Sequence, residues 1–149
     1  MANDQPPAAP APDLSVLTRQ HLRAGWLGLL VFALLGISLE ALHAWKNPAY
    51  LGVDNETRRL MWTLAHAHGV GLSLVQIAFA VTLRSLTSSR LVHVSRLLNA
   101  ASLFIPLGFF LGGVTTYEAD PGLGVLLVPI GALALVIALG LLVVQLFKA

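Results

Sequence analysis

Four long apolar runs divide this chain, and its charged residues lie between these runs or at the two ends of the chain. The uncharged stretches are Ala24–Leu39 (a pattern that continues through Glu40 and His43 to Trp45), Leu60–Leu83, Leu97–Tyr117 and Pro121–Phe147. Each is close to the roughly 20 residues with which a helix spans a hydrocarbon core of about 30 Å. Isolated strands cannot satisfy their backbone in lipid, and the alternation of a membrane barrel is missing. The pattern predicts an all-α integral membrane protein with four transmembrane helices, at about 17–45, 56–85, 91–117 and 121–147.

The composition supports this fold class. Of the 149 residues, 56% are hydrophobic and only 11% are charged, which is too few charges for the surface of a soluble domain. The three connections between the runs are short, which favours an up-down antiparallel bundle within one domain, residues 15–149. Residues 1–14 are rich in Pro and Ala and have nothing to pack against. We predict that they form a disordered tail and are not a signal peptide.

The distribution of charge predicts the orientation in the membrane. Six of the nine Lys and Arg residues flank one face of the predicted membrane domain: Arg19, Arg23, Arg84, Arg90, Arg96 and Lys148. Five of the seven acidic residues lie at the other face: Glu40, Asp54, Glu56, Glu118 and Asp120. Because cytoplasmic loops carry the Lys and Arg excess, we predict a multi-pass protein of the inner (plasma) membrane with both termini cytoplasmic. The basic residues are explained by the lipid bilayer and give no support to a nucleic-acid partner.

The second predicted helix has one small and polar face. The spacing Ala65-x3-Gly69-x3-Ser73 lets membrane helices approach closely, and so predicts the face that packs inside the bundle. That face comprises Trp62, Ala65, His66, Gly69, Ser73, Gln76 and Ala80. The opposite face, with Met61, Leu64, His68, Leu72 and Val75, is expected to contact lipid or a partner protein.

Ionisable side chains gather at one depth near the outer boundary. Glu40 and His43 follow Arg23 by 17 and 20 residues, and His66 precedes Arg84 by 18. At about 1.5 Å per residue, all three lie roughly 25–30 Å from the inner boundary. Ionisable groups within spanning segments usually face the interior and mark function.

Helical geometry selects among these side chains. Glu40 and His43 are three residues apart and share one face, which is how bundle proteins present a carboxylate and an imidazole to one metal ion. His66 and His68 are two residues apart, so their side chains leave the helix about 200° from each other. We therefore assign His66, which lies on the small face, to the cluster, and leave His68 without a role.

A metal site is the first chemistry that fits the cluster. The chain has no cysteine, which excludes thiolate ligands and iron–sulfur clusters. Glu40, His43, His66 and Glu118 supply the mixed nitrogen and oxygen ligands that suit zinc or iron. With such a site, the protein would be a metal-handling or redox module.

A b-type haem is the second. His43 and His66, on neighbouring helices at one depth, would be its axial ligands, and Arg58 or Arg59 would pair with its propionates. In either case the protein is a redox or metal-handling module with its site facing outward.

The third interpretation needs no cofactor. Glu40 would pair with Arg59 or Lys46, because a buried carboxylate needs such a partner. The protein would then be a non-catalytic accessory subunit of a membrane-protein partner or of a homo-oligomer. His21 and His93 lie among the inner basic residues and are expected to be solvated loop or interfacial groups. The sequence contains no phosphate-binding loop, nucleophile elbow or His-Glu-x-x-His motif, and it assigns no catalytic residue.

The predicted orientation is tested with reporter fusions at Ser88 and Asp54. A cytoplasmic reporter should be active at Ser88, and a reporter that works only outside the membrane should be active at Asp54, because Lys and Arg in short loops set the orientation. Activity of the external reporter at Ser88 would contradict the assignment.

Overall fold

The chain is built almost entirely of helices. A computed structural model describes residues 14–86, 90–117 and 119–148. Its long helices are α1 (Leu14–Ala44), α3 (Glu56–Thr82), α4 (Leu91–Val114) and α5 (Leu127–Leu146). Short elements join them: α2 (Pro48–Leu51), the 3-10 turns η1 (Val53–Asn55), η2 (Leu83–Ser85) and η3 (Leu123–Leu126), and the strands β1 (Thr116–Tyr117) and β2 (Asp120–Pro121).

Four helical segments are long and apolar enough to cross a membrane, as the pattern of apolar runs predicts. They are Leu14–Ala44, Val53–Ser85, Leu91–Val114 and Leu123–Leu146. The predicted tail, residues 1–14, lies outside the described residues except for Leu14, where α1 begins.

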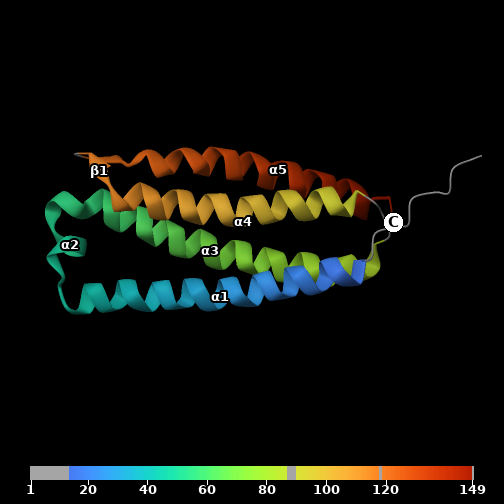
Figure 1. Ribbon diagram of the computed structural model, residues 1–149, viewed down its shortest axis with the longest axis horizontal. Helices are drawn as coiled ribbons and strands as arrows, with labels where there is room; N and C mark the ends of the chain where they lie inside the picture. Colours follow the sequence, from blue (N-terminus) through green and yellow to red (C-terminus); the bar gives the residue numbers. More distant parts are fainter. Residues whose placement is uncertain (1–13, 87–89, 118, 149) are drawn as a thin grey trace, which may run out of the picture.

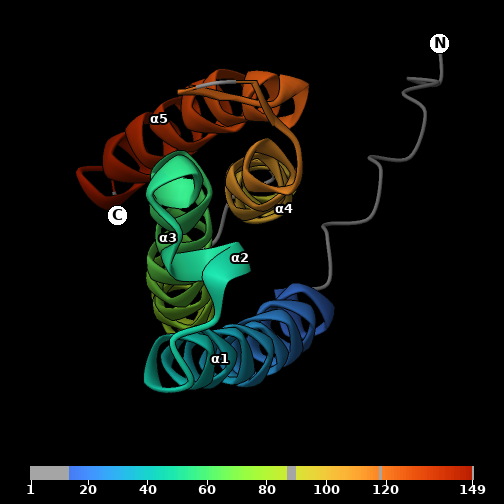
Figure 2. The same ribbon diagram turned by 90° about the vertical axis from the view of Figure 1, so that its left-hand side faces the viewer.

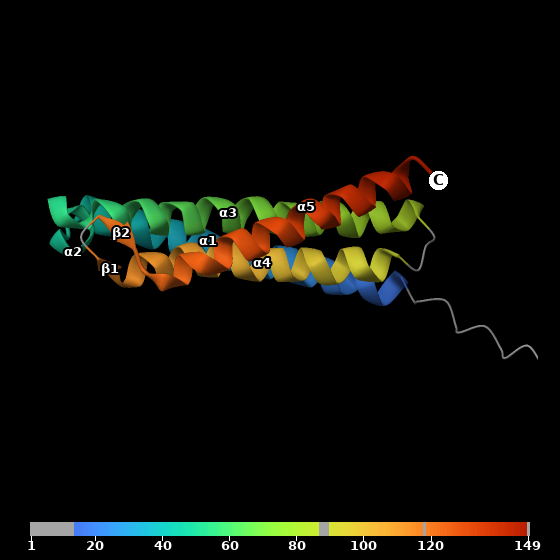
Figure 3. The same cartoon turned by 90° about the horizontal axis from the view of Figure 1, so that it is seen from above.

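The long helices pack in chain order, and the middle two form the centre. α1 packs against α3, α3 against α4, and α4 against α5 (Figure 1). α1 and α5 lie on opposite sides of the central pair, as the end-on view shows (Figure 2), and α5 is inclined across α4 (Figure 3). Within the most apolar part of each helix, 39% of α3 and of α4 is buried, against 11% of α1 and 17% of α5. The two flanking helices, α1 and α5, thus expose most of their apolar side chains.

The connection between α4 and α5 differs from the expected simple turn. α4 ends at Val114, and the next residues pair in an antiparallel hairpin, with Tyr117 opposite Asp120. The amide of Gly122 donates to the carbonyl of Gly112 at 2.8 Å, which ties the hairpin back to α4. Pro121 therefore lies in a strand and does not start a helix, and α5 begins at Leu127 after a 3-10 turn.

The small face of α3 is buried, as predicted. Ala65, Gly69, Ser73, Gln76 and Ala80 are among its buried residues. The opposite face was only partly predicted, because Met61 and Leu72 are buried as well. Leu72 packs with Ala101 and Ile105 of α4. α3 lies between two helices, so two of its faces are covered where the sequence pattern predicts one.

A buried histidine joins three of the helices, and the expectation that His21 is solvated was wrong. Its side chain is fully buried. Nδ1 donates to the Gln76 side-chain carbonyl, and Nε2 lies 2.7 Å from the Ser95 hydroxyl. Arg19 and Arg23 are each two positions away, which places their side chains about 200° around the helix from His21. His93, in contrast, is exposed as expected.

Gln76 extends this network along α4. Its Nε2 lies 2.8 Å from the Ser102 hydroxyl, 3.1 Å from Asn99 Oδ1 and 3.4 Å from the carbonyl of Leu98. The ring of Phe79 meets His21 edge-on, with ring centres 4.7 Å apart. One polar network in the apolar interior therefore links α1, α3 and α4.

Two glycines of α3 give a matched test of packing. A Cβ added at Gly69 would lie 2.3 Å from the ring of Phe32, whereas one added at Gly71 would meet nothing within 4 Å. Gly69→Ala should lower the free energy of unfolding by about 1–3 kcal/mol through overpacking. Gly71→Ala should leave it unchanged or raise it by up to about 1 kcal/mol. Thermal unfolding in detergent measures both, and equal effects would contradict the assigned contact between α1 and α3.

Removal of the buried imidazole should destabilise the protein. His21→Ala leaves polar atoms of Gln76 and Ser95 without their partner, which costs about 1–3 kcal/mol for a buried group. His93→Ala, the control on an exposed position, should change stability by less than about 0.5 kcal/mol. The same unfolding measurement compares them. A His21 variant as stable as the His93 variant would refute the network.

Candidate functional site

Glu40 and His66 line one hollow between α1 and α3, beside the short helix α2. Its volume is about 430 Å³, and its lining residues are Ala33, Gly36, Ile37, Leu39, Glu40, Tyr50, Thr63 and His66. The side chain of Glu40 is exposed and that of His66 is half-buried. Two of the residues assigned to the outer cluster from their depth thus meet at one surface.

The imidazole of His66 is fixed by the backbone of α1. Nδ1 lies 2.7 Å from the carbonyl oxygen of Phe32, which can only accept, so Nδ1 donates. The ring rests against Gly36, where an added Cβ would lie 2.5 Å from it. With Nδ1 donating, the neutral ring has its free lone pair on Nε2. Glycine at position 36 is what allows this close approach.

Of the other two assigned metal ligands, one is not at the hollow and the other cannot be placed. His43 is exposed and is not among the lining residues. Glu118 lies outside the described residues. Within residues 14–86, 90–117 and 119–148, no group of three or more His, Asp and Glu side chains is placed to hold a metal ion. Of the three assigned ligands that the structure describes, it brings together Glu40 and His66.

The arginines near the hollow have other partners. Arg59 Nη2 lies 3.6 Å from Glu56 Oε1, one turn away on the same helix. Among the described residues, no salt bridge joins Glu40 to Arg59 or to Lys46, the pairs expected if the cluster were an ion network. The side chain of Glu40 is exposed and has no salt-bridge partner among the described residues.

Arg58 joins several elements at the end of the molecule that carries α2. Its Nε donates to the carbonyl of Gly113 at 3.1 Å, and its Nη1 donates to Ala49 O at 3.1 Å and Asn55 Oδ1 at 2.8 Å. The guanidinium also lies over the ring of Trp62, 5.8 Å from its centre. These contacts hold α2, η1 and α4 to the start of α3.

Tyr50, which lines the hollow, belongs to an aromatic stack at this end. Its ring is nearly parallel to that of Trp62, with centres 6.3 Å apart, and Trp62 stacks in turn on Phe110 at 5.9 Å. Trp62 Nε1 donates to the Phe110 carbonyl at 3.2 Å. The aromatic side of the hollow is therefore fixed by contacts that reach across to α4.

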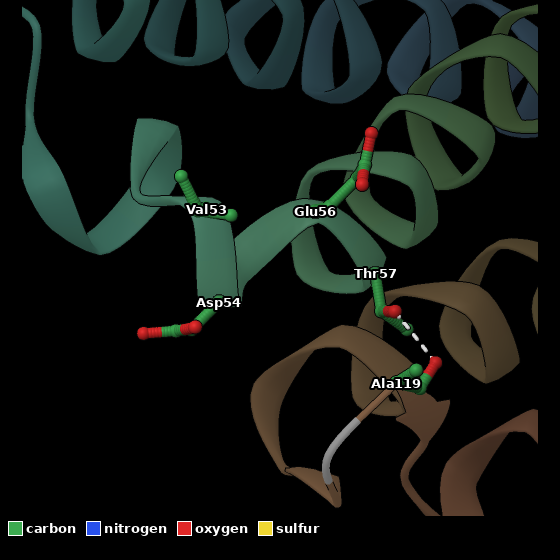
Figure 4. A pocket seen from close by; sticks show the side chains of 5 residues that line it. All are labelled: Val53, Asp54, Glu56, Thr57 and Ala119. Carbon is green, nitrogen blue, oxygen red and sulfur yellow. Dashed lines mark hydrogen bonds between the residues drawn. The ribbon is translucent and has the colours of Figure 1, made fainter.

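A second hollow lies between the start of α3 and the hairpin. It measures about 530 Å³ and is lined by Val53, Asp54, Glu56, Thr57 and Ala119 (Figure 4). The Thr57 hydroxyl donates to the Ala119 carbonyl at 2.7 Å. The carboxylates of Asp54 and Glu56 point in different directions (Figure 4). They do not form the pair that general acid–base chemistry or a metal ion would require.

His68 lies on a different face of α3 from His66, as helical geometry predicts. It is exposed. Its Nδ1 lies 2.9 Å from the carbonyl of Leu64, and its ring lies 4.8 Å from that of Phe109. The two histidines therefore belong to separate sites.

Comparison with known proteins does not add to this geometry. Tested against protein-family models, curated proteins and solved structures, the chain matches none of them. The function has to be argued from the residues of the hollow themselves.

Proposed function

We propose that this chain is a multi-pass inner-membrane protein in which Glu40 and His66 bind a divalent metal ion, zinc or iron, on the outer side. In this proposal the four apolar helices form an up-down antiparallel bundle with both termini in the cytoplasm. The protein serves as a redox or metal-handling module. Water or a substrate completes the coordination of the ion.

The hydrogen bond from His66 to Phe32 carries the proposal. Metal-binding histidines almost always donate their second ring nitrogen to a carbonyl or carboxylate, which fixes the ring and makes the other nitrogen more basic. His66 has this arrangement, with Nδ1 held at 2.7 Å by the Phe32 carbonyl. Glu40 supplies a carboxylate in the same hollow. Two protein ligands leave the remaining coordination positions of the ion open for water or a substrate.

The metal ion is favoured over the haem. A haem would take His43 and His66 as axial ligands, and His43 is not at the hollow. Its propionates would need Arg58 or Arg59, but Arg58 already donates to backbone and side-chain oxygens of three residues, and Arg59 pairs with Glu56. A divalent metal ion bound by Glu40 and His66 does not require His43, Arg58 or Arg59 to change position.

The test measures Zn²⁺ binding to the purified chain in detergent by isothermal titration calorimetry. The wild type should bind one ion per chain. Glu40→Ala and His66→Ala should each weaken binding about 10-fold or more, because each removes a ligand and not an outer contact. His43→Ala should leave binding unchanged, because His43 is exposed and does not line the hollow.

His68→Ala is the matched control, since this histidine is exposed on another face of the same helix. It should bind Zn²⁺ as the wild type does. A wild type that binds no Zn²⁺, or variants that bind it equally well, would refute the proposal. A Soret band in the purified protein that disappears in His66→Ala would replace the metal ion by haem. A protein with neither metal nor haem would support an accessory subunit.

A further inference from the structure

Tyr50 carries a polar group that the packing of the protein does not use. The residue is only 5% exposed. Within the part of the chain that the structure describes, its hydroxyl makes no hydrogen bond, although every buried side-chain oxygen there has a partner. The hydroxyl therefore belongs to the small exposed part of Tyr50. Because Tyr50 lines the hollow that Glu40 and His66 share, we assign its hydroxyl to that hollow.

The position of Tyr50 is fixed by its ring and backbone. The ring stacks on Trp62, and the amide donates to the carbonyl of Asn47 at 3.0 Å. Arg58 holds the preceding residue by donating to the carbonyl of Ala49 at 3.1 Å. A tyrosine that is buried usually gives its hydroxyl a hydrogen-bond partner. This hydroxyl is held in place without one, and so it is available to a ligand in the hollow.

Helical geometry brings the other two polar groups of the hollow toward Tyr50. Side chains of a helix lean toward its N-terminus and cover the preceding turn. Glu40 therefore leans toward Gly36, which has no side chain of its own and against which the ring of His66 rests. His66 in turn leans toward Trp62, one turn earlier on α3, on which Tyr50 stacks. A carboxylate, an imidazole and a phenol thus come from α1, α3 and α2 to one place.

The phenol distinguishes between the two ions proposed for this site. Proteins bind zinc with Cys, His, Asp and Glu, whereas tyrosine oxygen is among the ligands with which they hold iron. A phenol keeps its proton at neutral pH. A bound ion of higher charge favours loss of that proton more strongly, because the phenolate formed is negatively charged. Fe³⁺ is therefore the ion for which Tyr50 is a suitable ligand.

We propose that the phenolate of Tyr50 is the third protein ligand of the site and makes it selective for Fe³⁺ over Zn²⁺. When Fe³⁺ binds, the O–H bond of Tyr50 breaks, an Fe–O bond forms and the proton passes to water. Zn²⁺ is held by Glu40 and His66 alone. This inference rests on the metal site proposed for Glu40 and His66, and it adds a ligand and an ion preference to that site.

The experiment titrates the purified chain in detergent with Fe³⁺, supplied as its nitrilotriacetate complex, and records the visible spectrum. A phenolate bound to Fe³⁺ absorbs visible light by transfer of charge from ligand to metal, whereas a protonated phenol does not. The wild type should develop this band in proportion to the Fe³⁺ that it binds. Tyr50→Phe should lose the band and bind Fe³⁺ about 10-fold or more weakly, because one ligand is missing.

Tyr117→Phe is the matched control. The chain has two tyrosines, and Tyr117 lies exposed in β1. This variant should keep the band and the Fe³⁺ affinity of the wild type. Tyr50→Phe should keep the thermal stability and the Zn²⁺ affinity of the wild type, because the Tyr50 hydroxyl holds neither the fold nor the zinc ion.

The outcomes separate this inference from the proposed function. A wild type that binds Zn²⁺ but shows no band with Fe³⁺ would overturn the inference and leave the site of Glu40 and His66 standing. A band that survives in Tyr50→Phe would do the same. A folded Tyr50→Phe variant that loses Zn²⁺ together with Fe³⁺ would overturn the selectivity. A wild type that binds neither ion would overturn both proposals.

Discussion

The side chain of Gln76 fixes the arrangement on which the rest of the molecule depends. It lies in an apolar interior and is 2% exposed, yet its amide reaches partners on two other long helices. Burying a polar group in such surroundings costs free energy unless the group is hydrogen-bonded. Arrangements of the helices that leave the Gln76 amide without partners are therefore strongly disfavoured. Among the described residues every buried side-chain nitrogen and oxygen has a hydrogen-bond partner. Apolar contacts alone would allow several arrangements of these helices, and the polar network selects one of them.

The helices could be predicted because their signal is long and repeated, and the buried face of α3 because small residues recur along it. His21 could not be placed from its sequence neighbours. The charges of Arg19 and Arg23 suggested solvent, while its burial depends on Gln76, which is 55 residues away. Leu72 was misplaced for a related reason. A helix packed between two others buries two faces, and periodicity alone does not reveal the second one.

Counting residues from the inner charges was sufficient to bring Glu40 and His66 to one hollow, because depth in a bilayer is a one-dimensional coordinate that sequence fixes well. The sequence fixes less well the direction in which a side chain points around the helix axis. His43 shares a helix face with Glu40, yet it is exposed at the end of α1, beyond the hollow. Arg59 pairs with Glu56 on its own helix, since a partner one turn away is available without any tertiary contact.

Two of the hydrogen bonds that join α1 to α3 have a mechanical consequence. His21 meets Gln76, and the carbonyl of Phe32 meets His66. These contacts are 11 residues apart on α1 (32 − 21) and 10 apart on α3 (76 − 66), or about 16 and 15 Å at 1.5 Å per residue. A helix fastened at two such points cannot slide by one turn, about 5.4 Å, without breaking both. The two contacts therefore fix the register of α1 along α3.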